Sequence, residues 1–463
     1  MKLLTIIGIT GLLLAHTAQA QVPVKTLSPD MTKAIDLSVS EVLANTGAPS
    51  ASVAVVVDGH LAYAQAYGMA DIEHHRTATP DMRYGIASNS KSFLAATLYM
   101  LADEGKLSLN DKVSKYFPQL TRAKEISLKQ LLSHTSGYSD YYAQDYAVPD
   151  MLKPTTPQAI IEHWGRQKLD YEPGSDYQYS NTGFVIAALI VEKVTGKPYF
   201  TVLKEHIFTP LNMTSVVNND EAKIGAPDAI PYTRLALGPL IAAKPEGSGW
   251  MFGAGELAMT ARDLATWDMA ILNKRFLSKT VYQGLTTPIM LSTGKSSNYA
   301  QGLAVSEVSG HKVLRHGGEV AGFLSYNRLY PDDGLAIVVQ VNSDADQAGS
   351  TIMDRLVTIL TKPEGAQAII MGLIHDLKDG KIDRSHLTSN FNAYFSDDAV
   401  ANAQMALNSA GPLRVLTQVA SENRGGMTHL TLKAVFAKSV YSINAYVTKE
   451  GQIEQCLITP LTN

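Results

Sequence analysis

Ser88 and Lys91 are the residues of this chain whose types and spacing point most directly to chemistry. They lie three residues apart in Ser88-Asn89-Ser90-Lys91, at the start of an apolar run. On a helix, positions i and i+3 share one face, so the hydroxyl and the amine can meet. The free N–H groups of a first helical turn favour developing negative charge. A nucleophilic serine needs such a base and such a place for an oxyanion. Taken alone, this spacing also fits a helix cap followed by a solvated lysine.

Tyr179 and Asn181 form a second chemically suited pair, on a loop before a predicted helix. A tyrosine phenol has a pKa of about 10 in water. Beside the ammonium of Lys91 we expect the phenolate to be favoured, so that it can take the Ser88 proton. The Asn181 amide has a donor and an acceptor, which suit it to orient Lys91 and a substrate carbonyl. The alternative is a tyrosine-rich surface loop, because Tyr177 lies close by in the sequence.

His316-Gly317-Gly318 is a third candidate, at the end of the predicted strand His311–His316. Two glycines let the backbone approach a ligand closely and leave N–H groups accessible. The alternative is a plain tight turn. His134, after a short predicted helix, is expected to be a structural turn residue rather than a base.

Together, the three motifs resemble those of the serine beta-lactamase-related hydrolases in order and spacing. That family contains class C beta-lactamases, D-Ala-D-Ala carboxypeptidases, D-aminopeptidases and some esterases. The resemblance extends over roughly residues 31 to 343. It implies an antiparallel sheet flanked by helices and a mostly helical second lobe, with the site in the cleft between them.

The resemblance also implies a role for each matching residue. Ser88 would be the nucleophile and Lys91 its activating partner. Tyr179 would act as general base for acylation, general acid to the leaving group and base for the deacylating water. Asn181 would position Lys91 and the substrate, and the backbone N–H groups of Ser88 and Glu319 would form the oxyanion hole. The resemblance implies no metal and no organic cofactor.

The third motif departs from the family pattern. Beta-lactamases and carboxypeptidases of this family usually carry Lys-Thr-Gly, where this chain has His316-Gly317-Gly318. An imidazole, neutral near pH 7, replaces the lysine charge, and the threonine hydroxyl is absent. Those two groups help to hold the carboxylate of a penicillin or a peptide C-terminus. Esterase and D-aminopeptidase members tolerate a histidine here, so these two activities are favoured.

The elements that must position these residues follow an α/β pattern, in its α+β form. An apolar helix is predicted from Ser88 to about Glu104, and helices and long loops from there to about Gly310. Strands are expected before and after this helical stretch, at 52–57, 60–66, 311–316, 323–330 and 335–341. One antiparallel sheet assembled from the two ends of the region, with a helical insertion, is the simplest arrangement.

Residues 363–463 are expected to form a separate accessory α+β domain, after a hydrolase domain at residues 21–362. Pro363 and Gly365 mark a linker, and helices are predicted at 366–377 and 385–407. Four strands follow, at 413–419, 428–435, 439–447 and 452–458. The sequence of this domain contains no cluster of reactive residues. A second possibility is therefore that the protein functions through this domain, as a partner-binding or self-association module.

Composition and charge exclude some functions. The chain has 463 residues, is 45% hydrophobic and 18% charged, and carries a net charge of −4. A large core is therefore possible, and nucleic-acid binding through a basic surface is not expected. Cys456 is the single cysteine, so no disulfide can form within the chain.

Residues 1–20 have the pattern of a secretory signal peptide. An early lysine precedes an apolar stretch, and Ala18-Gln19-Ala20 fits a cleavage site. A membrane anchor is less favoured because the apolar stretch is short. We therefore expect an exported protein, periplasmic or secreted, with no transmembrane anchor after cleavage.

The sequence thus predicts an exported serine hydrolase that acts through a Ser88 acyl-enzyme on an ester, amide or lactam. Its substrate would be a small molecule or peptide, with cell-wall fragments among the candidates. The alternative is a non-catalytic binding or sensor protein that keeps the fold and binds peptidoglycan fragments.

Overall fold

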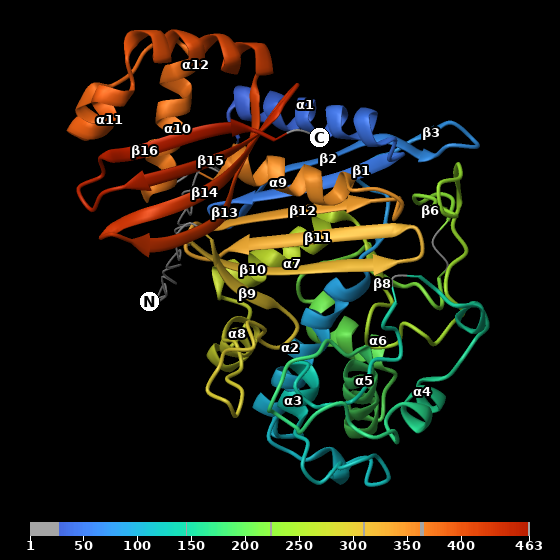
Figure 1. The fold of residues 1–463 in the computed structure, drawn as a ribbon. Coiled ribbons are helices and arrows are strands. Elements are labelled where there is room, and N and C mark those ends of the chain that lie inside the picture. Colours follow the sequence, from blue (N-terminus) through green and yellow to red (C-terminus); the bar gives the residue numbers. More distant parts are fainter. Residues whose placement is uncertain (1–26, 145, 223–224, 309–310, 362–364, 462–463) are drawn as a thin grey trace, which may run out of the picture.

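The computed structural model describes residues 27–144, 146–222, 225–308, 311–361 and 365–461 (Figure 1). The predicted signal peptide and the predicted domain boundary at residues 362 and 363 lie outside these ranges, so both stay predictions. Within the ranges, no helix combines the length and the apolar character needed to cross a membrane.

A seven-stranded antiparallel sheet forms the centre of the molecule. Its strand order is β3-β2-β1-β12-β11-β10-β9. The strands are β1 Ser50–Val57, β2 His60–Asp71, β3 Arg76–Thr77, β9 Ala304–Val308, β10 His311–Val320, β11 Phe323–Tyr330 and β12 Leu335–Val341. The pairing of β1 with β12, in register Val53 to Val339, joins the two ends of the region. The predicted single antiparallel sheet is therefore confirmed.

Helices cover both faces of this sheet (Figure 1). Along β1, successive side chains point to opposite faces, as the pleat requires. Ala54 and Val56 pack with α7 (Ala261–Asn273) and the helical lobe, whereas Val53 and Val55 pack with α1 (Pro29–Thr46) and α9 (Ala348–Leu360). Because both faces are covered, β1 and β12 are buried along nearly their whole length and are apolar except at Ser50, Ser52 and Gln340, with no polar–apolar alternation.

The helical lobe lies beside the sheet on the α7 face. It contains α2 Ser90–Asp103, α3 Leu128–Leu132, α4 Pro157–His163, α5 Asn181–Thr195, α6 Tyr199–Leu203 and α8 Lys279–Thr286. The short strands β4 Tyr84–Gly85, β5 Val217–Asn218 and β8 Leu257–Met259 form a small sheet, and β6 Tyr232–Arg234 pairs with β7 Leu240–Ala242. Helix α2 is buried on nearly every side, which explains why its sequence is apolar all round.

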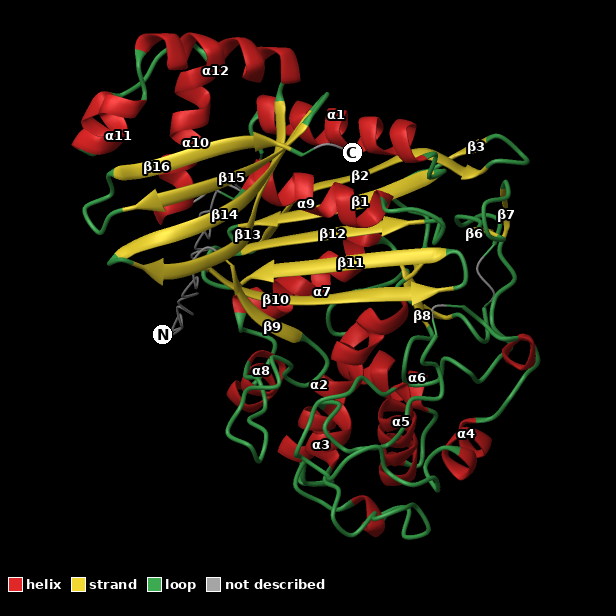
Figure 2. Ribbon diagram, viewed as in Figure 1, coloured by secondary structure: helices red, strands yellow, loops and turns green. Residues whose placement is uncertain are grey.

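The C-terminal part of the chain has its own sheet and core (Figure 2). Strands β13 Leu413–Arg424, β14 Met427–Phe436, β15 Val440–Val447 and β16 Ile453–Pro460 pair in order and antiparallel. Helices α10 Gly365–Lys378, α11 Ser389–Tyr394 and α12 Asp397–Ala410 complete it. Its core includes Ile374, Leu432 and the cysteine Cys456. Arg414 of β13 pairs with Glu41 of α1, which ties this part to the main sheet.

Two predicted elements differ in the structure. The predicted helix at 385–407 is wrong, because the chain breaks at Phe395 and restarts at Ser396, whose side chain caps α12. Strand β10 does not end at His316 but continues to Val320. The glycines that ended the predicted strand still pair with β11, since Gly317 lies opposite Tyr326.

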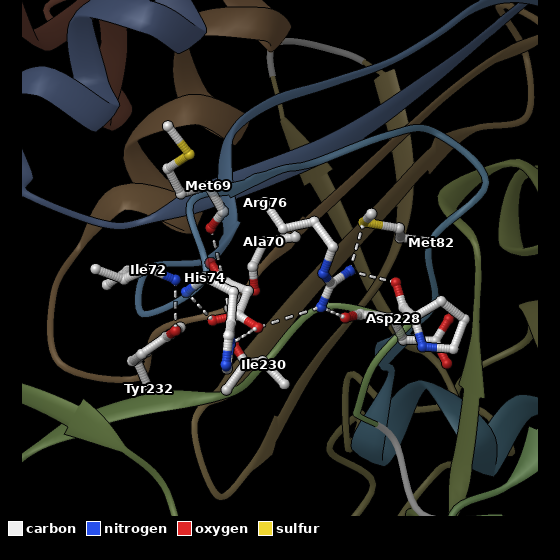
Figure 3. Close-up of polar contacts among 12 residues, drawn as sticks. Met69, Ala70, Ile72, His74, Arg76, Met82, Asp228, Ile230 and Tyr232 are labelled. Carbon is white, nitrogen blue, oxygen red and sulfur yellow. Dashed lines mark hydrogen bonds and ion pairs between the residues drawn. The ribbon is translucent and has the colours of Figure 1, made fainter.

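The segment 227–232 is held against β2 by polar contacts (Figure 3). The Arg76 guanidinium donates to the Asp228 carbonyl at 2.6 Å and also to the carbonyl of Pro227. The Asn342 amide donates to the Ile230 carbonyl at 2.9 Å. The position of this segment is therefore set by specific side chains, which matters for the cavity that it borders.

Candidate active site

Ser88 lies in a tight turn that leads into α2. The turn is a short 3₁₀ segment, Ala87–Asn89, and Ala87 has a φ of +47°, a left-handed conformation that non-glycine residues rarely adopt. Strand β10 presses against this turn at Gly318, where a Cβ would lie 2.1 Å from the Ile86 carbonyl oxygen. Only glycine permits this approach. Ser88 itself is half-buried and lines a cleft.

The amine of Lys91 lies directly beneath Ser88. Its Nζ is 2.8 Å from Ser88 Oγ, 2.8 Å from Asn181 Oδ1 and 2.7 Å from the Ala254 carbonyl oxygen. The side chain is fully buried. Burial lowers the pKa of Lys91 to about 7, although the nearby carboxyl groups of Asp140 and Glu256 oppose the shift. The uncharged amine is therefore accessible near neutral pH and can accept the hydroxyl proton.

Tyr179 faces Ser88 across the cleft. The two side chains share a hydrogen bond, and the Lys91 Nζ lies 5.0 Å from the centre of the tyrosine ring. Desolvation raises the pKa of Tyr179, and the hydrogen bond with Ser88 only partly opposes it. The expectation of a Tyr179 phenolate is therefore wrong, because desolvation of the buried ring, together with Tyr177 and Asp140, raises its pKa. Tyr179 is a phenol at neutral pH and is suited to donate a proton.

Asp140 fixes the amide that holds Lys91. Its carboxylate accepts from the Asn181 backbone N–H at 2.9 Å and from Asn181 Nδ2 at 3.2 Å. Asn181 is the first residue of α5, so the first contact also satisfies an N–H that has no partner within the helix. The second contact leaves Oδ1 facing Lys91. Asp140 lies on a loop without a motif, which is why the sequence did not reveal it.

His134 packs against the ring of Tyr179. The two rings stack with centres 4.0 Å apart. His134 Nδ1 accepts from the Ser180 N–H at 3.0 Å, and its carbonyl oxygen accepts from the Gln178 N–H at 3.1 Å. The residue thus fixes the loop that carries Tyr179, in keeping with the structural role expected from the sequence.

His316 carries no charge in this site. Burial and the neighbouring Lys91 lower its pKa to about 3, and its Nε2 lies 2.9 Å from the Tyr299 hydroxyl. The pairing of β10 with β9 ends at Arg315, so β9 does not cover residues 316–320. This part of the strand lies along the cleft, where Gly317, Gly318 and Glu319 line the wall.

The structure brings all of the predicted site residues together. A cleft of about 610 Å³ is lined by Ser88, Tyr179, Asn181 and residues 316–319, with Lys91 buried below. Residues that the sequence did not single out also line it, among them Asp140, Tyr142 and Leu324. The part of the chain that the structure describes contains no group of three or more histidine, cysteine, aspartate or glutamate residues placed to hold a metal ion.

The cleft is acidic. Among the described residues, no lysine or arginine lines it, whereas Asp140 and Glu319 do. Desolvation and the carboxylates of Glu246, Glu319 and Asp344 raise the pKa of Tyr142. Arg315 and Arg328 instead line a neighbouring hollow of about 320 Å³, which shares His316 and Gly317 with the cleft. Apart from the Lys91 amine beneath Ser88, a substrate carboxylate would therefore find no cation in the described lining of the cleft.

Tyr179→Phe is expected to lower the acylation rate by about 10²-fold, within the usual range for loss of a general acid or base. The protein should fold normally, because phenylalanine keeps the stack on His134. Ester hydrolysis under single-turnover conditions measures the effect. Tyr177→Phe, two residues away on the same loop, is the matched control. Unchanged kinetics for Tyr179→Phe would remove this residue from the mechanism.

The amino-acid sequence of this chain is similar to those of several known proteins. The Beta-lactamase family model matches residues 35–361. Protein flp of Staphylococcus aureus (strain MW2) is 28% identical over 327 residues, which cover 69% of this chain and 65% of that protein. The putative penicillin-binding protein PbpX of Bacillus subtilis (strain 168) is 28% identical over 277 residues, 57% of this chain and 65% of that protein. The match thus spans slightly less than two thirds of the length of these relatives.

Solved structures share the fold. The D-stereospecific amidohydrolase from Streptomyces sp. has 26% identity and a TM-score of 0.60, covering 70% of this chain and 97% of that one. The D-amino acid amidase from Ochrobactrum anthropi SV3 has 24% identity and a TM-score of 0.64, covering 72% and 99%. The octameric penicillin-binding protein homologue from Pyrococcus abyssi has 20% identity and a TM-score of 0.63, and covers 93% and 96%. The last similarity includes the C-terminal sheet.

Proposed function

Because this chain belongs to the Beta-lactamase family, we propose that it is an exported serine hydrolase that cleaves an ester or amide through an acyl-enzyme on Ser88. The observation that carries this proposal is the buried Lys91 amine, 2.8 Å from Ser88 Oγ and with its pKa lowered to about 7. Such an amine can remove the hydroxyl proton at neutral pH without a metal or an organic cofactor.

In the acylation step, the Lys91 amine accepts the Ser88 proton as Oγ bonds to the substrate carbonyl carbon. The backbone N–H groups of Ser88 and Glu319 stabilise the oxyanion. The Tyr179 phenol then gives a proton to the leaving nitrogen or oxygen, the bond to the leaving group breaks, and the Lys91 ammonium restores the phenol. In deacylation the amine takes a proton from water as the water oxygen bonds to the acyl carbon. The bond to Ser88 Oγ then breaks, the Lys91 ammonium returns the proton to Oγ, and the acid is released.

The acidic residues that line the cleft disfavour substrates that carry a carboxylate. A penicillin or a peptide C-terminus would place a carboxylate near Asp140 and Glu319, with no lysine at the third motif to hold it. Amides and esters without that carboxylate avoid this repulsion. Similarity to a D-stereospecific amidohydrolase and a D-amino acid amidase supports the amide class. Export rests on the leader pattern of residues 1–20, and cell-wall-derived peptides stay among the candidate substrates.

Intact-protein mass spectrometry tests the proposal directly. The protein is exposed to a panel of activated esters, D-amino-acid amides and beta-lactams and quenched within seconds. We expect a mass increase equal to one acyl group with esters or amides, and less adduct with carboxylate-bearing lactams. No adduct and no turnover across the whole panel would contradict the proposal and favour a binding protein that keeps the fold.

A further inference from the structure

We propose that a second cavity, adjoining the cleft, is a subsite for a substrate group that ends in an aliphatic ammonium. This acidic cavity has a volume of about 450 Å³ and is lined by three carboxyl groups, those of Asp220, Glu246 and Glu256. The substrate part of this inference rests on the proposed hydrolase function, whereas the binding part stands by itself.

The composition of the acidic cavity selects the chemical class of its ligand. Its remaining walls are largely apolar and come from Leu152, Ile230, Pro231, Val320 and Phe323 among others. No lysine, arginine or histidine lies among the described residues that line it. Carboxyl groups set in apolar walls suit a cation carried on a short hydrocarbon stem, because the stem gains by burial and the cation gains charge-assisted hydrogen bonds.

Glu256 is the observation that points to a missing partner. Its side chain is 1% exposed, Oε2 accepts from the Gly253 N–H, and Oε1 has no hydrogen-bond partner in the described part of the chain. A buried carboxyl oxygen without a partner is costly, and such groups in native proteins call for an explanation. A bound ammonium would supply the absent donor.

The groups around Glu256 favour the binding of a cation. Burial, Asp220 and Glu192 hold the pKa of Glu256 well above its usual range. Burial also raises the pKa of Asp220. Lys91, Tyr141 and Tyr199 are the other titratable groups that interact with Glu256. Because a nearby cation favours the charged form of a carboxyl group, binding of an ammonium should lower the pKa of Glu256 and favour loss of its proton.

The acidic cavity adjoins the catalytic cleft. Met251 lines both. Tyr142 of the cleft donates to Glu246 Oε1 at 2.9 Å, and the same oxygen accepts from the Ala321 N–H at 3.2 Å. Met251 is thus a wall that the two hollows share, and in our proposal the substrate carbonyl lies at Ser88 and the ammonium end beside the carboxyl groups beyond Met251.

The two arginines near the 227–232 wall do not neutralise this charge, because each has other partners. Arg83 pairs with the Asp228 carboxylate at 2.6 Å. Arg76 donates to the backbone carbonyls of Pro227 and Asp228, and Figure 3 shows it directed at this segment. Both arginines instead hold the wall of the cavity in place.

A matched pair of esters tests the substrate part. We expect kcat/KM for 4-nitrophenyl 6-aminohexanoate to exceed that for 4-nitrophenyl heptanoate by about 10-fold or more, as a charge-assisted hydrogen bond would give. In Glu256→Gln and Asp220→Asn the ratio of the two values should fall towards one. Asp397→Asn, whose side chain is fully exposed on the C-terminal domain, should keep the wild-type ratio. A wild-type ratio near one would overturn the inference.

Binding tests the cavity without catalysis. In Ser88→Ala protein, calorimetry should show n-hexylammonium binding at least about tenfold tighter than 1-hexanol, with proton release that Glu256→Gln abolishes. If neither ester reacts but this binding is found, the hydrolase proposal fails and the cavity assignment stands. Equal binding of amine and alcohol, or displacement of the amine by Ca²⁺ at lower concentration, would overturn the assignment.

Discussion

Ser88→Ala is expected to lower kcat/KM for ester and amide substrates by about 10⁴–10⁶-fold, the scale seen when a catalytic serine is removed from a serine hydrolase. The variant lacks the oxygen that forms the acyl bond, while the oxyanion donors and the cleft remain. Hydrolysis of the best ester in the panel gives the rate. Intact-protein mass spectrometry should show no adduct.

The fold should tolerate this change, because Ser88 is half-buried and the turn around it is fixed by Gly318 and Ala87. Thermal unfolding checks that point. Ser292→Ala, at an exposed serine, is the matched control and should label like the wild type. Labelling that persists in Ser88→Ala would assign the nucleophile to another residue.

Lys91→Met is expected to lower the acylation rate by about 10³–10⁴-fold, towards the upper end of the range for a general base. Methionine fills a similar volume but cannot accept the Ser88 proton. The pH profile gives a sharper readout. Because the pKa of Lys91 is lowered to about 7, the amine is charged and inactive as a base below that pH and uncharged above it. The wild-type rate should rise with pH through about 7, and the variant should lose this rise.

Stability separates this effect from misfolding. Methionine cannot donate to the buried Asn181 Oδ1 and Ala254 carbonyl, so the free energy of unfolding of Lys91→Met is expected to fall by about 1–3 kcal/mol while the protein stays folded at the assay temperature. Lys124→Met, at an exposed lysine, is the control and should keep the wild-type pH profile. A pH limb near 7 that survives in Lys91→Met would show that another group titrates there.

Local signals were enough to predict much of the fold. The strands β11 and β12 match their predicted ranges, because a turn at Asp333 and Gly334 separates two β-rich runs. The helix predicted from Ser88 is confirmed as a 3₁₀ turn followed by α2. The signal for its end was the glycine that closes the apolar run. The motif residues were identified by type, order and spacing, and the fold brings them to one cleft.

What the sequence could not supply depends on burial and on contacts between distant segments. The direction of the Tyr179 pKa was predicted wrongly because desolvation is set by the packed cleft and not by neighbours in the sequence. Asp140 was missed because its role comes from Asn181, 41 residues away. Glu256 gave no signal, since an isolated glutamate has no pattern that shows it buried.

The pairing of β1 with β12 also determines at which stage of synthesis and folding the candidate active site can form. Ser50 and Asn342, which bond to each other at 2.8 Å, are separated by 292 residues. Strand β10, which lines the cleft, is held in the sheet by β11, and β11 by β12. Contacts so distant in sequence form late, because a long loop must close first. A nascent chain that stops before residue 335 has the Ser88 turn and Lys91 but lacks β12, so the sheet that carries the cleft cannot be complete until nearly three quarters of the chain has been made.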